Sequence, residues 1–89
     1  MKLPGMPPRA PDNQDDTKLL ATRLRELREK AGLSQRALSA KLGVTQSWVY
    51  HRENLHTQLT LLDFVHWCRA CGADADPAFR RINRELGIG

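Results

Sequence analysis

With 89 residues, the chain is long enough for one small helical core but too short for a large enclosed substrate cavity. Its net charge of +4 is unevenly distributed: residues 17–59 contain eight basic and three acidic residues, whereas the flanking segments are close to neutral. This central positive charge suits a partner that carries phosphates, although a solvated basic helix surface has the same composition. No stretch has the length of a signal-peptide core or of a membrane-spanning helix.

The first sixteen residues, MKLPGMPPRAPDNQDD, predict a disordered arm, because four prolines and one glycine interrupt any regular pattern. Such an arm can wrap around a nucleic acid, but three aspartates offset Lys2 and Arg9, which favours a passive tail. The two cysteines occur without an export signal, which indicates reduced thiols and a cytoplasmic protein.

A first helix is predicted from about residue 17 to Gly32. Asp15, Asp16 or Thr17 can cap its amino end, where the two carboxylates also suit the helix dipole. Apolar residues recur at intervals of three and four and define one buried stripe. They are Leu20, Leu24, Leu27 and Ala31.

Two short helices joined by a tight turn are predicted between Ser34 and Asn54. Ser34 can cap the first helix, Gly43 supplies the positive φ that ends it, and Thr45 can cap the second. Two helices of about eight residues, separated by so short a turn, must cross steeply, which is typical of a helix-turn-helix. The predicted buried positions are Ala37, Leu38, Leu42 and Val49.

The segment AGLSQRALSAKLGVTQSWVYHREN resembles the helix-turn-helix of the Xre/Cro-repressor family, the lambda-repressor-like DNA-binding domains. In that family a glutamine opens each helix of the pair, and Gln35 and Gln46 have the family's spacing of eleven positions. The resemblance covers residues 19–75 and implies an all-α, compact five-helix lambda-repressor-like domain. Further residues that match the family pattern are Gly43, Val44, Val49 and Glu53.

Two positions depart from the family pattern. Arg52 stands where the family has an apolar or aromatic residue, and Leu55 stands where glycine is common. The departure at Arg52 affects how the second helix of the motif, the recognition helix, packs. The departure at Leu55 affects the loop that follows this helix. We expect three segments in the chain: a disordered arm over 1–16, a helix-turn-helix DNA-binding domain over 17–75, and a C-terminal helix over 76–89.

The resemblance implies that the second helix of the motif lies in the major groove of duplex DNA. It assigns base reading to Gln46, Ser47 and His51. It assigns phosphate contacts to Gln35 and Asn54, with Gln35 also bracing Gln46. Because a glutamine amide both donates and accepts hydrogen bonds, it can form a bidentate pair with adenine.

Other polar or aromatic residues in and around the motif complete the predicted DNA contacts. Tyr50 and Trp48 are large for a groove surface and can contact a thymine methyl group or the sugar-phosphate backbone. We group Tyr50 with the base-reading residues and Trp48 with the phosphate-binding residues. The remaining predicted phosphate contacts come from Arg36, Thr45 and His56.

The family also pairs an arginine of the first helix with the glutamate that closes the recognition helix. The matching residues in this chain are Arg28 and Glu53. Such a salt bridge would fix the recognition helix to the scaffold. A free surface arginine is the alternative.

A fourth helix is predicted from about Thr60 to Cys71. Leu62 falls on its polar side and Trp67 at the edge of its apolar face, so each is either ordinary scatter or part of an interface. Cys68 and Cys71 lie near its carboxyl end, where the dipole does not activate a thiol, and no further ligands complete a zinc site, so we expect buried packing. The predicted apolar face is Leu61, Phe64, Val65, Trp67, Cys68 and Cys71.

A last helix is predicted from Asp76, which can act as its cap and is followed by proline. Phe79, Ile82 and Leu86 then form a stripe that either closes the core or meets a second subunit. Because repressors of the family usually dimerise through their C-terminal part, we favour a dimer interface. Its predicted residues are Phe79, Ile82 and Leu86 together with Trp67.

No pattern predicts catalysis, a metal or a cofactor, since nothing places a nucleophile beside a base and no phosphate loop or HExxH sequence occurs. We expect a homodimeric transcriptional repressor, without enzymatic activity or membrane association, that reads a palindromic operator in double-stranded DNA on the cytoplasmic nucleoid. The alternative is an antitoxin that sequesters a partner protein, with Leu62, Trp67 and the last helix as its contact surface. A phage repressor and a restriction control protein both fit the sequence.

Overall fold

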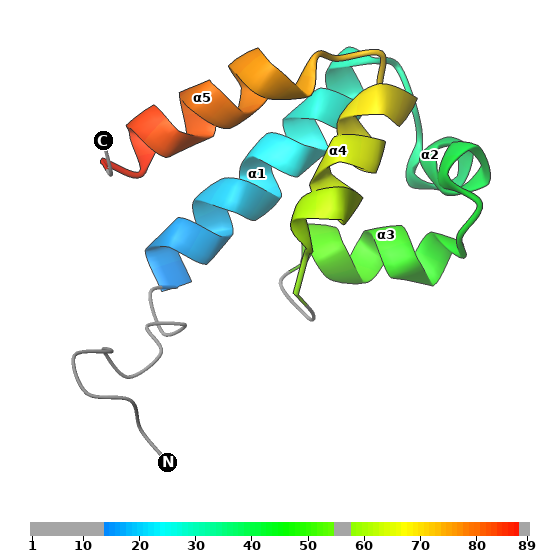
Figure 1. The fold of residues 1–89 in the computed structure, drawn as a ribbon. Helices are drawn as coiled ribbons and strands as arrows, with labels where there is room; N and C mark the ends of the chain where they lie inside the picture. Colours follow the sequence, from blue (N-terminus) through cyan, green and yellow to red (C-terminus); the bar gives the residue numbers. More distant parts are fainter. Residues whose placement is uncertain (1–13, 55–57, 88–89) are drawn as a thin grey trace.

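The computed structural model describes residues 14–54 and 58–87, and over these residues it consists of five α-helices without a strand (Figure 1). The helices are α1 (Gln14–Lys30), α2 (Gln35–Leu42), α3 (Gln46–Glu53), α4 (Leu61–Ala70) and α5 (Ala75–Glu85). The predicted all-α, five-helix architecture is confirmed. Most of the predicted arm and His56 lie outside the described residues. Within the described part, no helix is both long enough and apolar enough to cross a membrane.

The caps predicted for the helix-turn-helix are present. The Ser34 hydroxyl accepts the N–H of Ala37 at 3.0 Å, and the Thr45 hydroxyl accepts the N–H of Trp48 at 3.1 Å. Gly43 ends α2 with a φ of 73°, a left-handed conformation that would strain other residues. Because these local contacts end one helix and begin the next within a few residues, α2 and α3 pack directly against each other.

Two helices begin earlier than predicted. α1 begins inside the predicted arm, so Asp15 and Asp16 lie in its first turn rather than at its cap. α5 is capped by Asp74, whose carboxylate accepts the N–H of Asp76 at 3.1 Å, and not by Asp76 as expected. Pro77 is therefore the third residue of α5, where it costs no hydrogen bond because the first four N–H groups of a helix have no intrahelical partner.

The helix-turn-helix and α5 lie on opposite sides of α1 and α4 (Figure 1). On one side, α3 packs against α1, and α2 packs against α4. On the other side, α5 packs against both α1 and α4. An ion pair between Arg23 of α1 and Glu85 of α5, with Nη2 and Oε2 2.6 Å apart, joins the outer edges of these two helices and lowers the pKa of Glu85.

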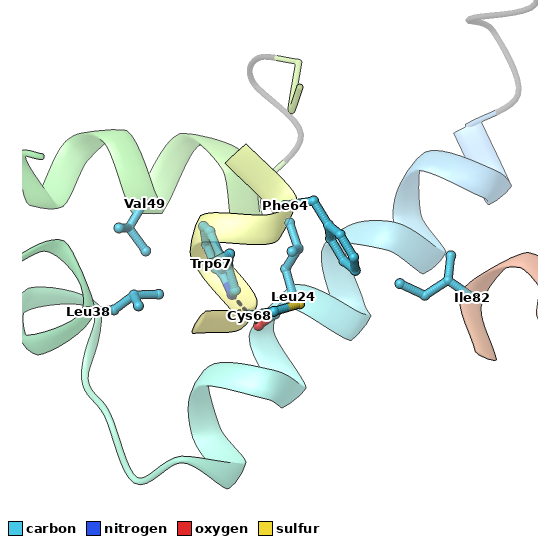
Figure 2. Close-up of a cluster of buried hydrophobic side chains, with 7 residues drawn as sticks. All are labelled: Leu24, Leu38, Val49, Phe64, Trp67, Cys68 and Ile82. Atoms are coloured by element: carbon cyan, nitrogen blue, oxygen red, sulfur yellow. Dashed lines mark hydrogen bonds between the residues drawn. The ribbon is translucent and has the colours of Figure 1, made fainter. Parts of the chain in front are cut away.

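The core is one cluster of buried side chains to which every helix contributes. Trp67 of α4 lies between the residues of the helix-turn-helix and those nearer α5 (Figure 2). It is 0% exposed, and its indole N–H donates to the carbonyl oxygen of Leu24 at 3.1 Å. This hydrogen bond satisfies the one polar atom of the ring. The cluster consists of Leu24, Leu38, Val49, Phe64, Trp67, Cys68 and Ile82.

This core corrects the predicted dimer interface. Trp67 and Ile82 are 0% and 6% exposed within a single chain, so neither can form a surface for a second one. The reason is that α5 folds back over α1 and α4 and closes the core with Ile82. Conversely, Leu61 was expected in the core but is 72% exposed, because it opens α4 before the helix passes between its neighbours.

A buried carboxylate fastens α3 to α1 and α2. The Glu53 side chain is 1% exposed, and the Arg28 guanidinium donates to both of its oxygens, from Nε at 2.7 Å and from Nη2 at 3.1 Å. Arg28 Nη1 also donates to the Leu33 carbonyl oxygen, and Gln35 Nε2 donates to Glu53 at 3.0 Å. The hydrogen bonds with Glu53 raise the pKa of Arg28. The salt bridge implied by the resemblance is thus present, whereas Gln35 bonds to Glu53 instead of bracing Gln46.

Ile82→Asp tests whether α5 belongs to the core. An unpaired carboxylate at this buried position should lower the free energy of unfolding by more than about 3 kcal/mol. Asn83→Asp adds the same charge to the same helix at a half-buried polar position and should cost less than about 1 kcal/mol. Urea unfolding followed by circular dichroism gives both values. Similar losses for the two variants would show that Ile82 is not a core residue.

The contribution of the Arg28–Glu53 pair can be measured with a double-mutant cycle. Glu53→Ala or Arg28→Ala should each lower the free energy of unfolding by about 2–4 kcal/mol, because the remaining charge stays buried without its partner. The double variant should lose much less than the sum of the two losses. Arg25→Ala, at an exposed position of α1, is the control and should be nearly neutral. A coupling energy of zero would mean that the two charges do not interact.

Candidate nucleic-acid interface

α3 carries a strip of polar and aromatic side chains on its solvent-facing side. Gln46 and Ser47 lie in its first turn and Tyr50 and His51 in its second, and all four are exposed. Val49 of the same helix is 0% exposed and anchors the opposite face in the core. Because residues four positions apart are neighbours on a helix surface, the four exposed side chains form one continuous strip. It contains all the residues that the sequence assigns to base reading.

The carboxyl end of the strip is held by local contacts. The rings of Tyr50 and His51 meet edge to face, with their centroids 5.6 Å apart at 72°. Asn54, the C-cap of α3, is half-buried, and its Nδ2 donates to the Tyr50 carbonyl oxygen at 2.8 Å. These contacts restrict the two aromatic residues before any ligand is present.

Four of the residues predicted to contact phosphates fall into two groups. Arg36 and Thr45 are exposed, Thr45 caps α3 beside the strip, and Arg36 forms no ion pair with any described residue. Gln35 and Asn54 are half-buried, and their amide nitrogens already donate to other groups of the protein. Of these four residues, Arg36 is the one with a positive charge, and its exposed side chain can meet a phosphate.

Trp48 does not stand on the exposed face where the sequence placed it. The side chain is half-buried, and its ring lies 6.2 Å from the ring of Trp67 at an angle of 33°. The guanidinium carbon of Arg52 lies 3.7 Å from the centroid of the Trp48 ring. Sequence reasoning missed this stack, although an arginine four residues after a tryptophan in a helix is a signal for it.

The two cysteines lie in and beside the core. Cys68 is buried, as predicted, and Cys71 is half-buried, and both are free thiols. Burial raises the pKa of Cys68, and it raises the pKa of Cys71 to about 11. Both thiols are therefore protonated near neutral pH and poor nucleophiles. Among the described residues there is no cluster of three or more side chains suited to hold a metal ion.

Comparison with known proteins places this geometry in a family. Residues 19–79 match the sequence pattern of the helix-turn-helix domain family. The structure is similar to that of an XRE-family like protein from Pseudomonas syringae pv. tomato str. DC3000, with a TM-score of 0.76 and 29% sequence identity over 88% of this chain and 93% of that chain. No curated protein has significant sequence similarity to the chain.

A second solved structure shares the fold. The clp gene regulator ClgR from C. glutamicum superimposes with a TM-score of 0.69 and 18% sequence identity, over 83% of this chain and 96% of that chain. The family pattern spans more than half of the chain and includes the whole helix-turn-helix. This chain belongs to the Xre-type helix-turn-helix family of DNA-binding proteins.

Proposed function

We propose that the protein is a transcriptional repressor that binds a palindromic operator in duplex DNA as a homodimer, in the cytoplasm and without a catalytic step. Its family and its regulator neighbour support the coarser function of a DNA-binding transcriptional regulator. The observation that carries the proposal is the two-sided character of α3. Val49 and Glu53 anchor one face, and the four-residue strip is exposed on the other. A helix built in this way can enter the major groove without repacking the domain.

The side chains of the strip suit base edges. Gln46 can donate to and accept from adenine, and the Ser47 hydroxyl can serve several bases. The Tyr50 ring can contact a thymine methyl group, and His51 can hydrogen-bond a base edge. Arg36 lies at the start of α2, where its charge can meet the phosphate backbone beside the groove.

Gln46→Ala and Arg36→Ala should affect DNA binding in different ways. Gln46→Ala should cost about 1–3 kcal/mol on the selected site and relax the preference at one base position. Arg36→Ala should weaken binding to all sequences alike and reduce the slope of log K against log salt by about 0.9. Selection from a random duplex library, followed by salt titrations, measures both effects. Unchanged affinity and specificity in Gln46→Ala would exclude its role in base reading.

The dimer proposal needs a surface that remains exposed in the single chain. A groove of about 330 Å³ opens between the amino-terminal ends of α1 and α4 and one side of α5, and we call it the α4–α5 groove. Three of the predicted interface residues, Phe79, Ile82 and Leu86, line it; Ile82 is buried, whereas Phe79 is 50% exposed. Other apolar residues of the groove are Leu20, Leu59, Leu61 and Phe64.

A second copy of the chain is the proposed occupant of this groove. One recognition helix reads only a few base pairs, so a two-fold pair is needed to specify a longer site. α4 follows closely after α3 in the chain. A dimer that reads one face of the duplex must keep its two recognition helices on the same side. The expected spacing of the two helices is about 34 Å, one turn of B-DNA.

Phe79→Asp should give monomers that remain helical and bind the operator far more weakly, because a carboxylate would be desolvated at the interface. Leu62→Asp is the matched control: Leu62 is 62% exposed on α4 but does not line the groove. The Leu62→Asp variant should remain dimeric. Sedimentation equilibrium and circular dichroism distinguish the two variants. A wild-type protein that stays monomeric while it saturates operator DNA would contradict the dimer.

A partner-binding antitoxin is the second candidate function. The observation in its favour is that Leu61 and Leu62, at 72% and 62% exposed, stand next to each other at the start of α4. Trp67, which the sequence offered for the same role, is buried and takes no part. Stoichiometric co-purification of a second chain, lost in Leu62→Asp, would favour this candidate.

A further inference from the structure

Arg52 lies at the carboxyl end of α3, beside the predicted DNA contacts, yet much of its guanidinium group faces the protein. Nη1 donates to the carbonyl oxygen of Trp48 at 3.3 Å. Nε has no solvent-accessible surface and no hydrogen-bond partner. No carboxylate of the described residues forms an ion pair with Arg52. The contact that orients the group is therefore its stacking on the Trp48 ring, with 3.7 Å between Cζ and the ring centroid.

The stack gives α3 a second line of attachment. Val49 and Glu53, four residues apart, form one ridge of the helix, which is fastened to the core and to Arg28. Trp48 and Arg52, also four residues apart, form the neighbouring ridge, and Trp48 reaches Trp67 of α4. Contact along two adjacent ridges resists rotation of a helix about its axis more strongly than contact along one ridge does. Any such rotation would move the strip of base-facing side chains sideways.

We propose that Arg52 is a positioning residue for DNA recognition: by covering Trp48 it holds that ring against Trp67, and so fixes the rotation of α3. This role rests on the proposed insertion of α3 into the major groove. It differs from a phosphate contact, which is the ordinary role of an arginine near a DNA interface. Two of its three guanidinium nitrogens are directed into the protein, which favours positioning over a phosphate contact.

Two substitutions separate the two roles. Lysine keeps the positive charge but lacks the planar group that stacks on an aromatic ring. Methionine has no charge, but its flexible apolar side chain can still cover the Trp48 ring. A positioning role therefore tolerates Arg52→Met better than Arg52→Lys, and a phosphate contact gives the opposite order.

The DNA experiment compares the selected operator with an unrelated duplex of the same length. Arg52→Lys should bind the operator about tenfold more weakly, with unchanged affinity for the unrelated duplex and an unchanged salt slope. Arg52→Met should remain within about threefold of the wild type on the operator. A wild-type affinity of Arg52→Lys, or a salt slope lowered by about 0.9 in Arg52→Met, would overturn the proposal in favour of a phosphate contact.

A measurement on the free protein tests the stack without DNA. The chain has two tryptophans, Trp48 and Trp67, so quenching of their fluorescence by acrylamide reports how well they are covered. Arg52→Lys should increase quenching, and Arg52→Met should not. In a Trp48→Phe background, Arg52→Lys should have no effect, because Trp67 is buried. Equal quenching in the wild type and in Arg52→Lys would overturn the proposed stack.

The two measurements also separate this inference from the function on which it rests. If the wild type selects no specific duplex, the proposed function fails, and DNA positioning fails with it, even when quenching reveals the stack. If the wild type and Gln46→Ala behave as expected but Arg52→Lys binds like the wild type, only the positioning role fails. Increased quenching in Arg52→Lys, together with about tenfold lower affinity for the operator alone, supports both.

Discussion

The arrangement of the helix-turn-helix depends on the carboxylate of Glu53, which is almost completely withdrawn from water. A buried charge costs several kcal/mol unless donors replace its hydration. Here the donors come from two different helices, Arg28 on α1 and Gln35 on α2. All three helices must therefore be correctly placed at once, or the carboxylate loses a partner. The carboxylate is fully bonded only in this one arrangement of the three helices.

Local signals made most of the fold predictable from the sequence. Ser34 and Thr45 are caps that depend on residues within three positions, and Gly43 ends α2 through its own backbone conformation. Such features do not depend on the rest of the structure, so the helices and their turn could be placed by inspection. The Arg28–Glu53 pair is different, because its partners lie 25 positions apart and only the family resemblance joined them.

The wrong predictions concern side chains whose burial depends on tertiary packing. A helical stripe shows which side chains are apolar but not which of them another helix will cover, so Trp67 and Ile82 were assigned to a surface and Leu61 to the core. The stack of Arg52 on Trp48 was missed because the family pattern has an apolar or aromatic residue at position 52. In this chain the guanidinium group of Arg52 covers the aromatic ring instead. The correct assignment of each residue required the positions of α4 and α5.

The recognition helix is rigid because of its surroundings and not because of its own sequence. α3 has eight residues, and an isolated helix of that length is unstable in water. Its helical form is maintained by Val49 in the core and by the clamp at Glu53. The entropy of ordering these residues is therefore lost when the domain folds and not when a ligand binds. The contacts made by the exposed strip can then contribute directly to discrimination between DNA sequences, since none of their free energy is needed to form the helix.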